Sequence, residues 1–334
     1  MTGKEISNWI DPAMYAAEPL DASTGPTVTL LNMTPDPLGA IAASTLIYEG
    51  RVIRDLSEVT DEDRVRCFEQ IQKTRLNAPF EYVDFHFLIE GVTRSFTHQM
   101  VRQRTAVYSQ ESLRFAVKED AADGVALPPS LAGTTGEGIR MEYQNNSGEY
   151  IRDEAIHPLS DAELKRYEWD KAIESMSEAY QSLVNSGMPA EDARGLLPHS
   201  ITTRLHYKTN LRNLLEHSGN RLCSQAQHEW KIIFSLIKKA IREYSDTNRE
   251  LYGTGVRWQY AKLADMFLPI CYQTGKCEFK ASFDRPCKIR DRVDTFEASN
   301  IPSSQWENPP EDLNSAAIRP AEWLLDPFAA REKK

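Results

Sequence analysis

The pattern of apolar and polar positions predicts helices over several long stretches of the chain. In QAQHEWKIIFSLIKKAIREY, 225–244, apolar residues recur every three or four positions, at Ile233, Leu236, Ile237, Ala240, Ile241 and Tyr244. This spacing keeps one face apolar and predicts an amphipathic helix. The same spacing predicts helices in IAASTLIY, 41–48, and DRVRCFEQIQK, 63–73. AELKRYEWDKAIESMSEAYQSLVNSG, 162–187, is a further helix, and Gly187 would end it.

Runs of β-forming and alternating residues predict strands between these helices. TVTLLNMT, 27–34, is a strand that ends at the prolines after it. FEYVDFHFLIEG, 80–91, largely alternates apolar and polar residues, which predicts a half-buried strand, and VTRSFTHQMVRQR, 92–104, follows as a short helix. Three more segments are predicted in the same way: a short helix in MPAEDARGLLP (188–198), an exposed strand in ITTRLHYKT (201–209) and a short helix in NLRNLLEHSG (210–219).

The patterned stretches divide the chain into three parts. Residues 1–26 are polar with Pro and Gly and are expected to form an N-terminal arm, and residues 27–277 form one domain. Within that domain the pattern is lost over 116–165, where ten acidic residues stand against four basic ones, so we expect an inserted surface region. Residues 278–334 are proline-rich and are expected to be a tail rather than a second domain.

Composition and the lack of targeting patterns indicate where in the cell the protein is expected. With 334 residues, of which 41% are hydrophobic and 26% charged, the chain can bury a sizeable core. It has no apolar run that could span a membrane, no leader pattern at the N-terminus, and too few cysteines for a disulfide framework. We therefore expect a soluble protein of the cytoplasm, of the host cell if the protein is viral, without a membrane partner. A formal net charge of −10 also disfavours nucleic acid as a partner.

Arginines collect in three separated segments of this acidic chain. RQRTAVYSQESLRF, 102–115, holds three of them, ARGLLP holds Arg194, and NLRNLLEHSGNR, 210–221, holds Arg212 and Arg221. A guanidinium group can hold a phosphate or a planar oxyanion by two parallel hydrogen bonds. These arginines could simply pair with surrounding acids on the surface. Their recurrence in three segments favours a site for a phosphorylated or carbonyl-rich ligand.

The first of these segments contains a motif that is typical of one enzyme family. Arg102, Gln103 and Arg104, followed after seven residues by Ser112, resemble the Arg-x-Arg-x7-Ser signature of the flavin-dependent thymidylate synthases. The likeness continues in NAPFEYVDFHFLIEG before the motif, and in GMPAEDARGLLP and ITTRLHYKTNLRNLLEHSGNRLCSQAQHEW after it, so it covers about residues 27–250. It implies an α/β (α+β) fold with a central, mostly antiparallel sheet flanked by helices, and makes 27–277 the catalytic domain.

The resemblance also implies a reaction and its partners. In these enzymes reduced FAD delivers a hydride to dUMP, methylenetetrahydrofolate supplies the one-carbon unit, and NADPH reduces the flavin. The expected activity is therefore transfer of a one-carbon unit to C5 of a pyrimidine deoxynucleotide, most simply dUMP to dTMP. Each FAD and nucleotide site of the family is assembled from several subunits of a homotetramer, so a homotetramer is expected.

Site residues follow from the resemblance by position. The residues expected to bind the nucleotide are Gln99, Arg102, Gln110, Ser112, Arg114, Arg194 and Arg221. The residues expected to line FAD are Ala78, Arg102, Gln103, Arg104, Asn210, Arg212 and Glu216. Arg221 is the expected catalytic residue, because a guanidinium beside the uracil would stabilise the ionised ring and make C5 nucleophilic.

Five positions depart from the family pattern. Gln103 replaces a histidine, Leu76 and Ala78 replace a histidine and a threonine, Gln110 replaces a glutamate, and Glu216 replaces an asparagine. Most of these positions belong to the flavin and folate side, so two alternatives stay open. One is a related enzyme that hydroxymethylates dUMP or acts on UMP or dCMP. The other is a nucleotide-binding relative without catalytic activity.

No metal site is expected. Cys271, Cys277 and Cys287 are separated by five and nine residues, which matches no common zinc pattern. Cys223 is expected to be a packed residue. Ser112 is expected to bind a ligand rather than to act as a nucleophile, because no arrangement of His and Asp around it is evident.

Overall fold

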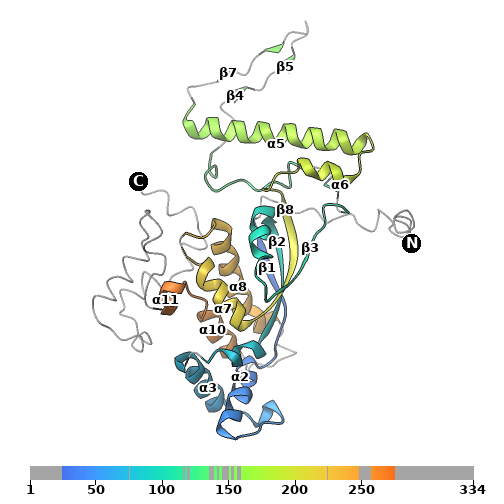
Figure 1. Cartoon of the computed structure of the whole chain (residues 1–334). Helices are drawn as coiled ribbons and strands as arrows, with labels where there is room; N and C mark the ends of the chain where they lie inside the picture. Colours follow the sequence, from blue (N-terminus) through green and yellow to red (C-terminus); the bar gives the residue numbers. More distant parts are fainter. Residues whose placement is uncertain are drawn as a thin grey trace, which may run out of the picture. The chain divides into compact units, whose positions relative to one another are not determined.

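The described part of the chain forms two compact units. The computed structural model describes residues 25–74, 76–115, 117–118, 121–134, 139–140, 143–144, 150–151, 154–155, 159–223, 225–247 and 257–274 (Figure 1). Among these, 26–90, 96–109 and the residues from 205 onward form one unit, which we call the sheet unit. Residue 25, 91–95 and 110–204 form the other, which we call the α5 unit after its longest helix.

Most residues of a four-stranded sheet belong to the sheet unit. Its strands are β1 (Thr27–Met33), β2 (Asp84–Thr93), β8 (Thr202–Asn210) and β3 (Val107–Gln110), in the order β1-β2-β8-β3. β1 and β2 run antiparallel, with a shift of register between Leu30 and Asn32. Phe85, Phe87 and Ile89 of β2 are buried and alternate with half-buried residues, as the period of two predicts.

Helices cover the buried face of this sheet. α8 (His228–Thr247) contacts β1, and α10 (Arg257–Asp265) lies beside α8 in Figure 1. The predicted amphipathic face of α8 is confirmed, because Ile233, Ile237 and Ile241 are all buried. α7 (Leu211–Arg221) begins directly after β8, and the side chain of Asn210 caps it by accepting a hydrogen bond from the backbone N–H of Asn213, at 3.0 Å. α11 (Ile270–Thr274) contacts α7.

The chain between β1 and β2 forms a helical layer of the same unit. Its elements are α2 (Pro37–Leu46), η3 (Ile47–Glu49), η4 (Leu56–Glu58), α3 (Asp61–Thr74) and η5 (Ala78–Tyr82). α2 begins at Asp36, whose φ of 46° is in the left-handed region and whose carboxylate accepts from the N–H of Gly39. Gly39 leaves room for that carboxylate, because a Cβ there would lie 2.1 Å from Asp36 Oδ2.

The α5 unit is organised around one long helix. α5 (Asp161–Asn185) opens with a capping box in which Ser160 and Glu163 bond each other's backbone N–H groups, and Gly187 with a φ of 91° follows its end as predicted. Tyr180 of α5 is buried with Ala121 and Ala193. α6 (Ala190–Ala193) and η6 (Arg194–Leu196) contact α5. Two short antiparallel ladders, nested in the chain, pair β4 (Ile139–Arg140) with β7 (Glu154–Ala155) and β5 (Tyr143–Gln144) with β6 (Tyr150–Ile151).

Several element predictions need correction. ITTRLHYKT forms a strand, but β8 is not exposed: it lies between β2 and β3, and Leu205 and Tyr207 are buried. The segment predicted as a strand from residue 80 begins with the turn of η5, and the helix predicted over 92–104 is α4 (Arg94–Met100) alone. β3, α10 and α11 were not predicted. The arm and tail predictions, except for Gly25 and Pro26, lie outside the described residues.

Candidate functional site

The turn after α4 places the first arginines of the motif. α4 ends at Met100, and the backbone N–H of Gln103 donates to the Met100 carbonyl at 3.1 Å, so the chain leaves the helix in a tight turn. Arg102 and Arg104 are exposed on this turn. Arg102 Nε donates to the His98 carbonyl at 3.1 Å. Both guanidinium groups are therefore available to an anionic ligand.

Gln103, between these arginines, points inward. Its Oε1 accepts a hydrogen bond from Tyr207 Oη at 2.9 Å, and its Nε2 donates to the Asn213 carbonyl at 3.1 Å. Asn213 Nδ2 returns a hydrogen bond to the Thr105 carbonyl at 3.0 Å. Burial, with the nearby phenol of Tyr108, raises the pKa of Tyr207, so its hydroxyl stays a donor. Gln103 thus ties the turn to β8 and α7 through both ends of its amide.

The remaining residues predicted to line FAD gather around the first turns of α7. Ala78 lies on η5, which contacts α7, and Asn210 is the N-cap of α7. Arg212 Nη1 lies 2.5 Å from Glu81 Oε1 and Arg212 Nε lies 3.6 Å from Glu216 Oε1. The hydrogen bond from Arg212 to Glu81 raises the pKa of Arg212. All seven residues predicted to line FAD belong to the sheet unit.

Gln99 and Arg221 meet in the same unit. Gln99 lies on α4, and its Oε1 accepts from Trp230 Nε1 at 2.9 Å and from Arg221 Nη1 at 3.4 Å. Gln99 Nε2 donates to Gln227 Oε1 at 2.6 Å, and Gln227 Nε2 donates to Glu229 Oε2 at 3.0 Å. The structure thus brings together two of the predicted nucleotide residues and links them to the start of α8.

Arg221, the predicted catalytic residue, ends α7 as a partly buried cation. Its guanidinium carbon lies 4.7 Å from the centroid of the Trp230 ring, in the geometry of a cation–π contact. Burial lowers the pKa of Arg221, yet a guanidinium remains charged at any physiological pH. No carboxylate of the described residues pairs with it. This arrangement can stabilise a negative charge on a bound ligand.

The other predicted nucleotide residues lie in the α5 unit. Gln110 ends β3, and Ser112 Oγ accepts from the backbone N–H of Arg114 at 3.3 Å. Arg114 Nε lies 3.2 Å from Glu191 Oε2, and Arg194 Nε donates to the Glu191 carbonyl at 3.0 Å. Arg114 and Arg194 therefore meet at one turn of α6. Each unit assembles its own part of the predicted nucleotide set.

Glu111, between two predicted nucleotide residues, was missed by the sequence analysis. Its side chain is only 8% exposed, with Oε1 3.5 Å from Lys118 Nζ and 3.8 Å from Arg204 Nε. Thr203 Oγ1 donates to its Oε2 at 3.4 Å, and Arg94 Nη2 donates to its backbone carbonyl at 2.7 Å. These contacts fix the loop of Ser112. Trp230 was missed too, because it belongs to no motif and was not among the apolar positions that predicted the helix.

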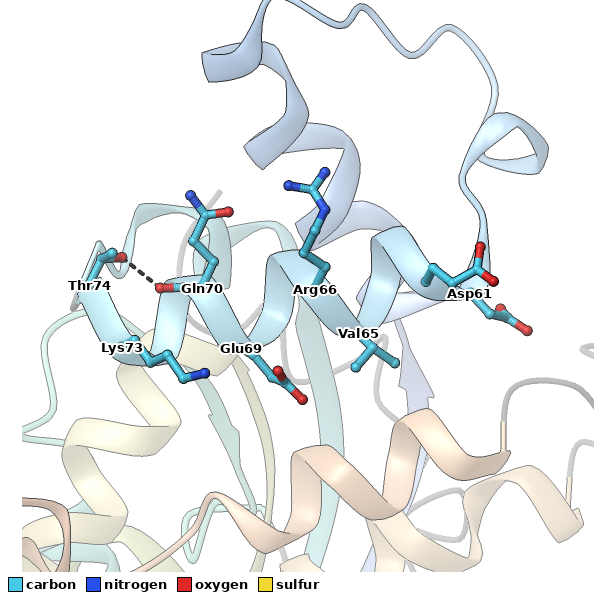
Figure 2. A pocket seen from close by; sticks show the side chains of 8 residues that line it. Asp61, Val65, Arg66, Glu69, Gln70, Lys73 and Thr74 are labelled. Carbon is cyan, nitrogen blue, oxygen red and sulfur yellow. Dashed lines mark hydrogen bonds between the residues drawn. The ribbon is translucent and has the colours of Figure 1, made fainter. Parts of the chain in front are cut away.

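α3 also lines a surface groove. It has a volume of about 780 Å³ and is lined by Asp61, Glu62, Val65, Arg66, Glu69, Gln70, Lys73 and Thr74. Figure 2 shows that these side chains all come from α3, where Thr74 Oγ1 donates to the Gln70 carbonyl at 2.9 Å. None of the predicted site residues lines it.

The described residues hold no cluster of metal ligands and no helix that could span a membrane. No three His, Cys, Asp or Glu side chains of the described residues come together as metal ligands. The thiols of Cys67, Cys223 and Cys271 are free, and Cys277 and Cys287 lie outside the described residues. None of the helices in the described ranges is both long and apolar enough to cross a membrane.

Solved structures offer similar chains at low identity. The UMP/dUMP methylase PolB from Streptomyces cacaoi, crystallised with 5-Br dUMP, aligns with a TM-score of 0.49 at 19% identity, over 66% of this chain and 90% of that chain. The flavin-dependent thymidylate synthase ThyX of Helicobacter pylori, complexed with FAD and dUMP, aligns with a TM-score of 0.44 at 18% identity, over 68% of this chain and 97% of that chain.

Sequence comparisons identify the family. Residues 29–245 match the family of the thymidylate synthase complementing protein, Thy1. The flavin-dependent thymidylate synthase of Geobacter sulfurreducens is 31% identical over 204 residues, which are 60% of this chain and 76% of that protein. That of Pyrococcus furiosus is 31% identical over 258 residues, which are 75% of this chain and 88% of that protein. The chain therefore belongs to the family of the flavin-dependent thymidylate synthases and is an enzyme of that family.

Proposed function

We propose that the enzyme transfers a one-carbon unit to C5 of dUMP and forms dTMP, with FAD as cofactor and methylenetetrahydrofolate and NADPH as co-substrates. Membership of the family supports flavin-dependent chemistry on a pyrimidine nucleotide. The observation that carries the choice of an anionic pyrimidine is the Arg221 guanidinium, which is partly buried and pairs with no carboxylate of the described residues. A partly buried cation without a counter-charge favours an anionic ligand.

Arg221 is proposed to act on the base. A guanidinium beside the uracil favours the ionised ring, because an opposite charge at close range stabilises the charged form. The ionised ring is richer in electrons at C5, the atom that must attack the one-carbon unit. Gln99 contributes a donor at the same place, since one hydrogen of its Nε2 has no partner among the described residues. Together the two side chains would bind, orient and polarise the base.

Ser112, Arg114 and Arg194 are proposed to bind the nucleotide phosphate. Two guanidinium groups and a hydroxyl form the donor set that a phosphate requires. The pair of Arg114 with Glu191 is about half exposed on both sides, at 49% and 54% of the side-chain surface. Exposed ion pairs contribute little stability, so a phosphate can displace Glu191 at small cost. The proposal includes the homotetramer that the family resemblance implies.

The turn after α4 fits the flavin cofactor through its donor set. Arg102 and Arg104 are exposed neighbours, and their guanidinium groups suit the pyrophosphate of FAD. Asn210 and Arg212 at the N-terminus of α7 would add donors beside them. When bound in its reduced form, FAD supplies the hydride. Gln103 holds the shape of the turn through its bonds to Tyr207 and Asn213.

Product analysis tests the proposal. The purified protein, loaded with FAD, is incubated with methylenetetrahydrofolate, NADPH and one nucleotide at a time, and the product mass is measured. We expect dTMP from dUMP. A hydroxymethylated product, or turnover of UMP or dCMP instead of dUMP, would assign the enzyme to a related reaction. A protein that binds nucleotide but takes up no FAD would overturn the catalytic proposal.

A further inference from the structure

We infer that Trp230 is a positioning residue for the nucleotide: its indole fixes the amide of Gln99 and holds the guanidinium of Arg221 in place. The inference rests on the proposed function, because it assumes that Gln99 and Arg221 contact a pyrimidine nucleotide. It concerns a residue to which neither the motif nor the family resemblance assigned a role. Its basis is the set of contacts around the indole.

The hydrogen bonds determine which way the Gln99 amide faces. An indole N–H and a guanidinium can only donate, so the amide atom that meets Trp230 Nε1 at 2.9 Å and Arg221 Nη1 at 3.4 Å must be the oxygen. The nitrogen of Gln99 therefore faces Gln227. Glu229 lies at the other end of this series of hydrogen bonds, and its carboxylate can only accept. The nitrogen of Gln227 therefore faces Glu229, and the oxygen of Gln227 faces Gln99.

This orientation decides what Gln99 offers to a ligand. Its oxygen is occupied by two donors, and one of its two N–H groups is bound to Gln227. The second N–H has no partner among the described residues. Gln99 is therefore set as a donor toward an oxygen of the ligand. Without the indole N–H, the oxygen would lose the shorter of its two hydrogen bonds, and the amide would be held less firmly in this orientation.

The same indole also holds Arg221. The guanidinium carbon lies 4.7 Å from the ring centroid, and the negative face of an indole attracts a cation. This contact partly offsets the cost of burying a charge that no described carboxylate pairs with. Burial, with the nearby charge of Arg221, lowers the pKa of His217 to about 3, so the ring that contacts Trp230 edge-on stays neutral and adds no second cation.

Packing keeps the indole from moving. Trp230 is fully buried, with Phe96 at a centroid distance of 4.3 Å, His217 at 4.6 Å and Phe234 at 6.1 Å. Side chains in such a close-packed cluster occupy one rotamer. The position of the indole N–H is thus set by the core before any ligand arrives. Pre-organisation of this kind raises affinity, because the ligand need not order the residues that bind it.

The experiment is a double-mutant cycle on the FAD-loaded protein, with dUMP binding measured by calorimetry. Trp230→Phe keeps an aromatic ring and removes the N–H. We expect it to weaken dUMP binding roughly tenfold, the effect of one hydrogen bond and part of a cation–π contact. In the Gln99→Ala background the same change should cost less than about threefold, because the amide through which it acts is gone.

A matched control separates positioning from general loosening of the core. Phe234→Leu alters the same buried cluster without a contact to Gln99 or Arg221, so it should lower the melting temperature and leave dUMP affinity unchanged. If the losses of dUMP affinity in Trp230→Phe and Gln99→Ala simply multiplied in the double variant, the inference would be overturned. So would equal losses of affinity in Phe234→Leu and Trp230→Phe. Wild-type protein that binds no dUMP would overturn the proposed function and this inference with it.

A second measurement needs no substitution of Trp230. The chain has six tryptophans, so an indole-15N spectrum shows a small set of resonances. Loss of its acceptor in Gln99→Ala should shift the resonance of Trp230, and addition of dUMP to the wild type should shift that same resonance. If no single indole responds to both changes, the inference is wrong.

Discussion

Gln103 is a single residue that departs from the family motif and stabilises the fold around it. Its position in the motif predicted a contact with the flavin. In the structure both ends of its amide are bound within the protein, to Tyr207 Oη and to the Asn213 carbonyl. A shorter side chain there would leave the buried hydroxyl of Tyr207 without this partner. The residue therefore stabilises the turn on which its two neighbouring arginines are presented.

The two hydrogen bonds of Gln103 predict that Gln103→Ala destabilises the protein. An unsatisfied buried hydroxyl and a lost hydrogen bond should lower the free energy of unfolding by about 1–3 kcal/mol. Urea denaturation monitored by circular dichroism measures the change. The neighbouring Arg104→Ala serves as the control, because Arg104 is exposed and should affect FAD affinity and not stability. Equal stability of the two variants would contradict the role assigned to Gln103.

Arg221→Ala should lose turnover and keep the fold. Loss of a charge that stabilises the ionised ring should raise the activation barrier by about 2–4 kcal/mol, a rate drop of roughly a hundredfold or more. The initial rate of dTMP formation at saturating dUMP measures it. Arg66→Ala in α3 is a suitable control, because Arg66 pairs with Glu49 on the surface, apart from the predicted site. A rate within about twofold of wild type would remove Arg221 from the mechanism.

At the scale of elements, one network joins three helices at the start of α2. Arg64 of α3 donates to both carboxylate oxygens of Asp36, at 2.9 and 2.5 Å. Gln259 of α10 donates to Asp36 Oδ1 at 2.8 Å and accepts from the Leu38 N–H at 2.9 Å. Burial alone would raise the pKa of Asp36, but the hydrogen bonds from Arg64 and Gln259 outweigh it and lower the pKa.

This network predicts a pH-dependent effect of Asp36→Asn. Asparagine tolerates the left-handed backbone and can still cap α2, so the variant mainly removes the charge that Arg64 binds. We expect a loss of about 2 kcal/mol in the free energy of unfolding at pH 7. A carboxylate with a lowered folded-state pKa stabilises above its unfolded pKa of about 3.9, and that contribution is lost as pH falls through the folded value.

The difference in free energy of unfolding between wild type and Asp36→Asn should therefore be constant from pH 7 to about pH 5 and become smaller below about pH 4. Urea denaturation at pH 7, 5 and 3.5 measures it. The surface variant Asp265→Asn, which removes an exposed pair with Arg242, should cost much less at every pH. If this difference in free energy of unfolding became larger in acid, the carboxylate of wild-type Asp36 would not be stabilised in its charged form.

The elements that sequence patterns predicted, and those that they missed, differ in one physical respect. α8 was found because its apolar residues recur every three or four positions from Ile233 to Tyr244. This pattern lies within one helix and needs no knowledge of the neighbouring elements. β8 was placed at the surface, because alternation in one strand says which side is buried and not which strands flank it. β3 has only four residues, and its pairing comes from the sheet rather than from its sequence.

The candidate site divides in a similar way. Arg102, Ser112 and Arg221 were assigned to the site by the family resemblance. In the structure Arg102 and Arg221 belong to the sheet unit and Ser112 to the α5 unit. The residues that hold them, Glu111 and Trp230, carry no motif. Glu111 is recognisable only once Lys118, Thr203 and Arg204 are folded around it, because its burial depends on chain segments that are far apart in sequence.

At the scale of the whole molecule, both units of an acidic chain carry arginines of the predicted nucleotide set. The formal net charge is −10, yet predicted nucleotide residues of the sheet unit include Arg102 and Arg221, and those of the α5 unit include Arg114 and Arg194. A net negative charge disfavours non-specific binding of nucleic acid, which is itself anionic. Each unit contributes part of the predicted set, which raises the question of which subunits complete one site.

The homotetramer that the family resemblance implies predicts complementation between inactive variants. Arg221→Ala removes a predicted nucleotide residue of the sheet unit, and Arg114→Ala removes one of the α5 unit, so each variant alone should be nearly inactive. If one site takes these two arginines from different subunits, co-refolded mixtures contain sites with both arginines intact. Random mixing in equal amounts should restore roughly a quarter of wild-type activity, since each arginine is intact in about half of the subunits. Light scattering checks that the mixtures are tetramers. If both arginines come from the same subunit, every site of a mixture lacks one of them, and activity should stay at the level of the separate variants.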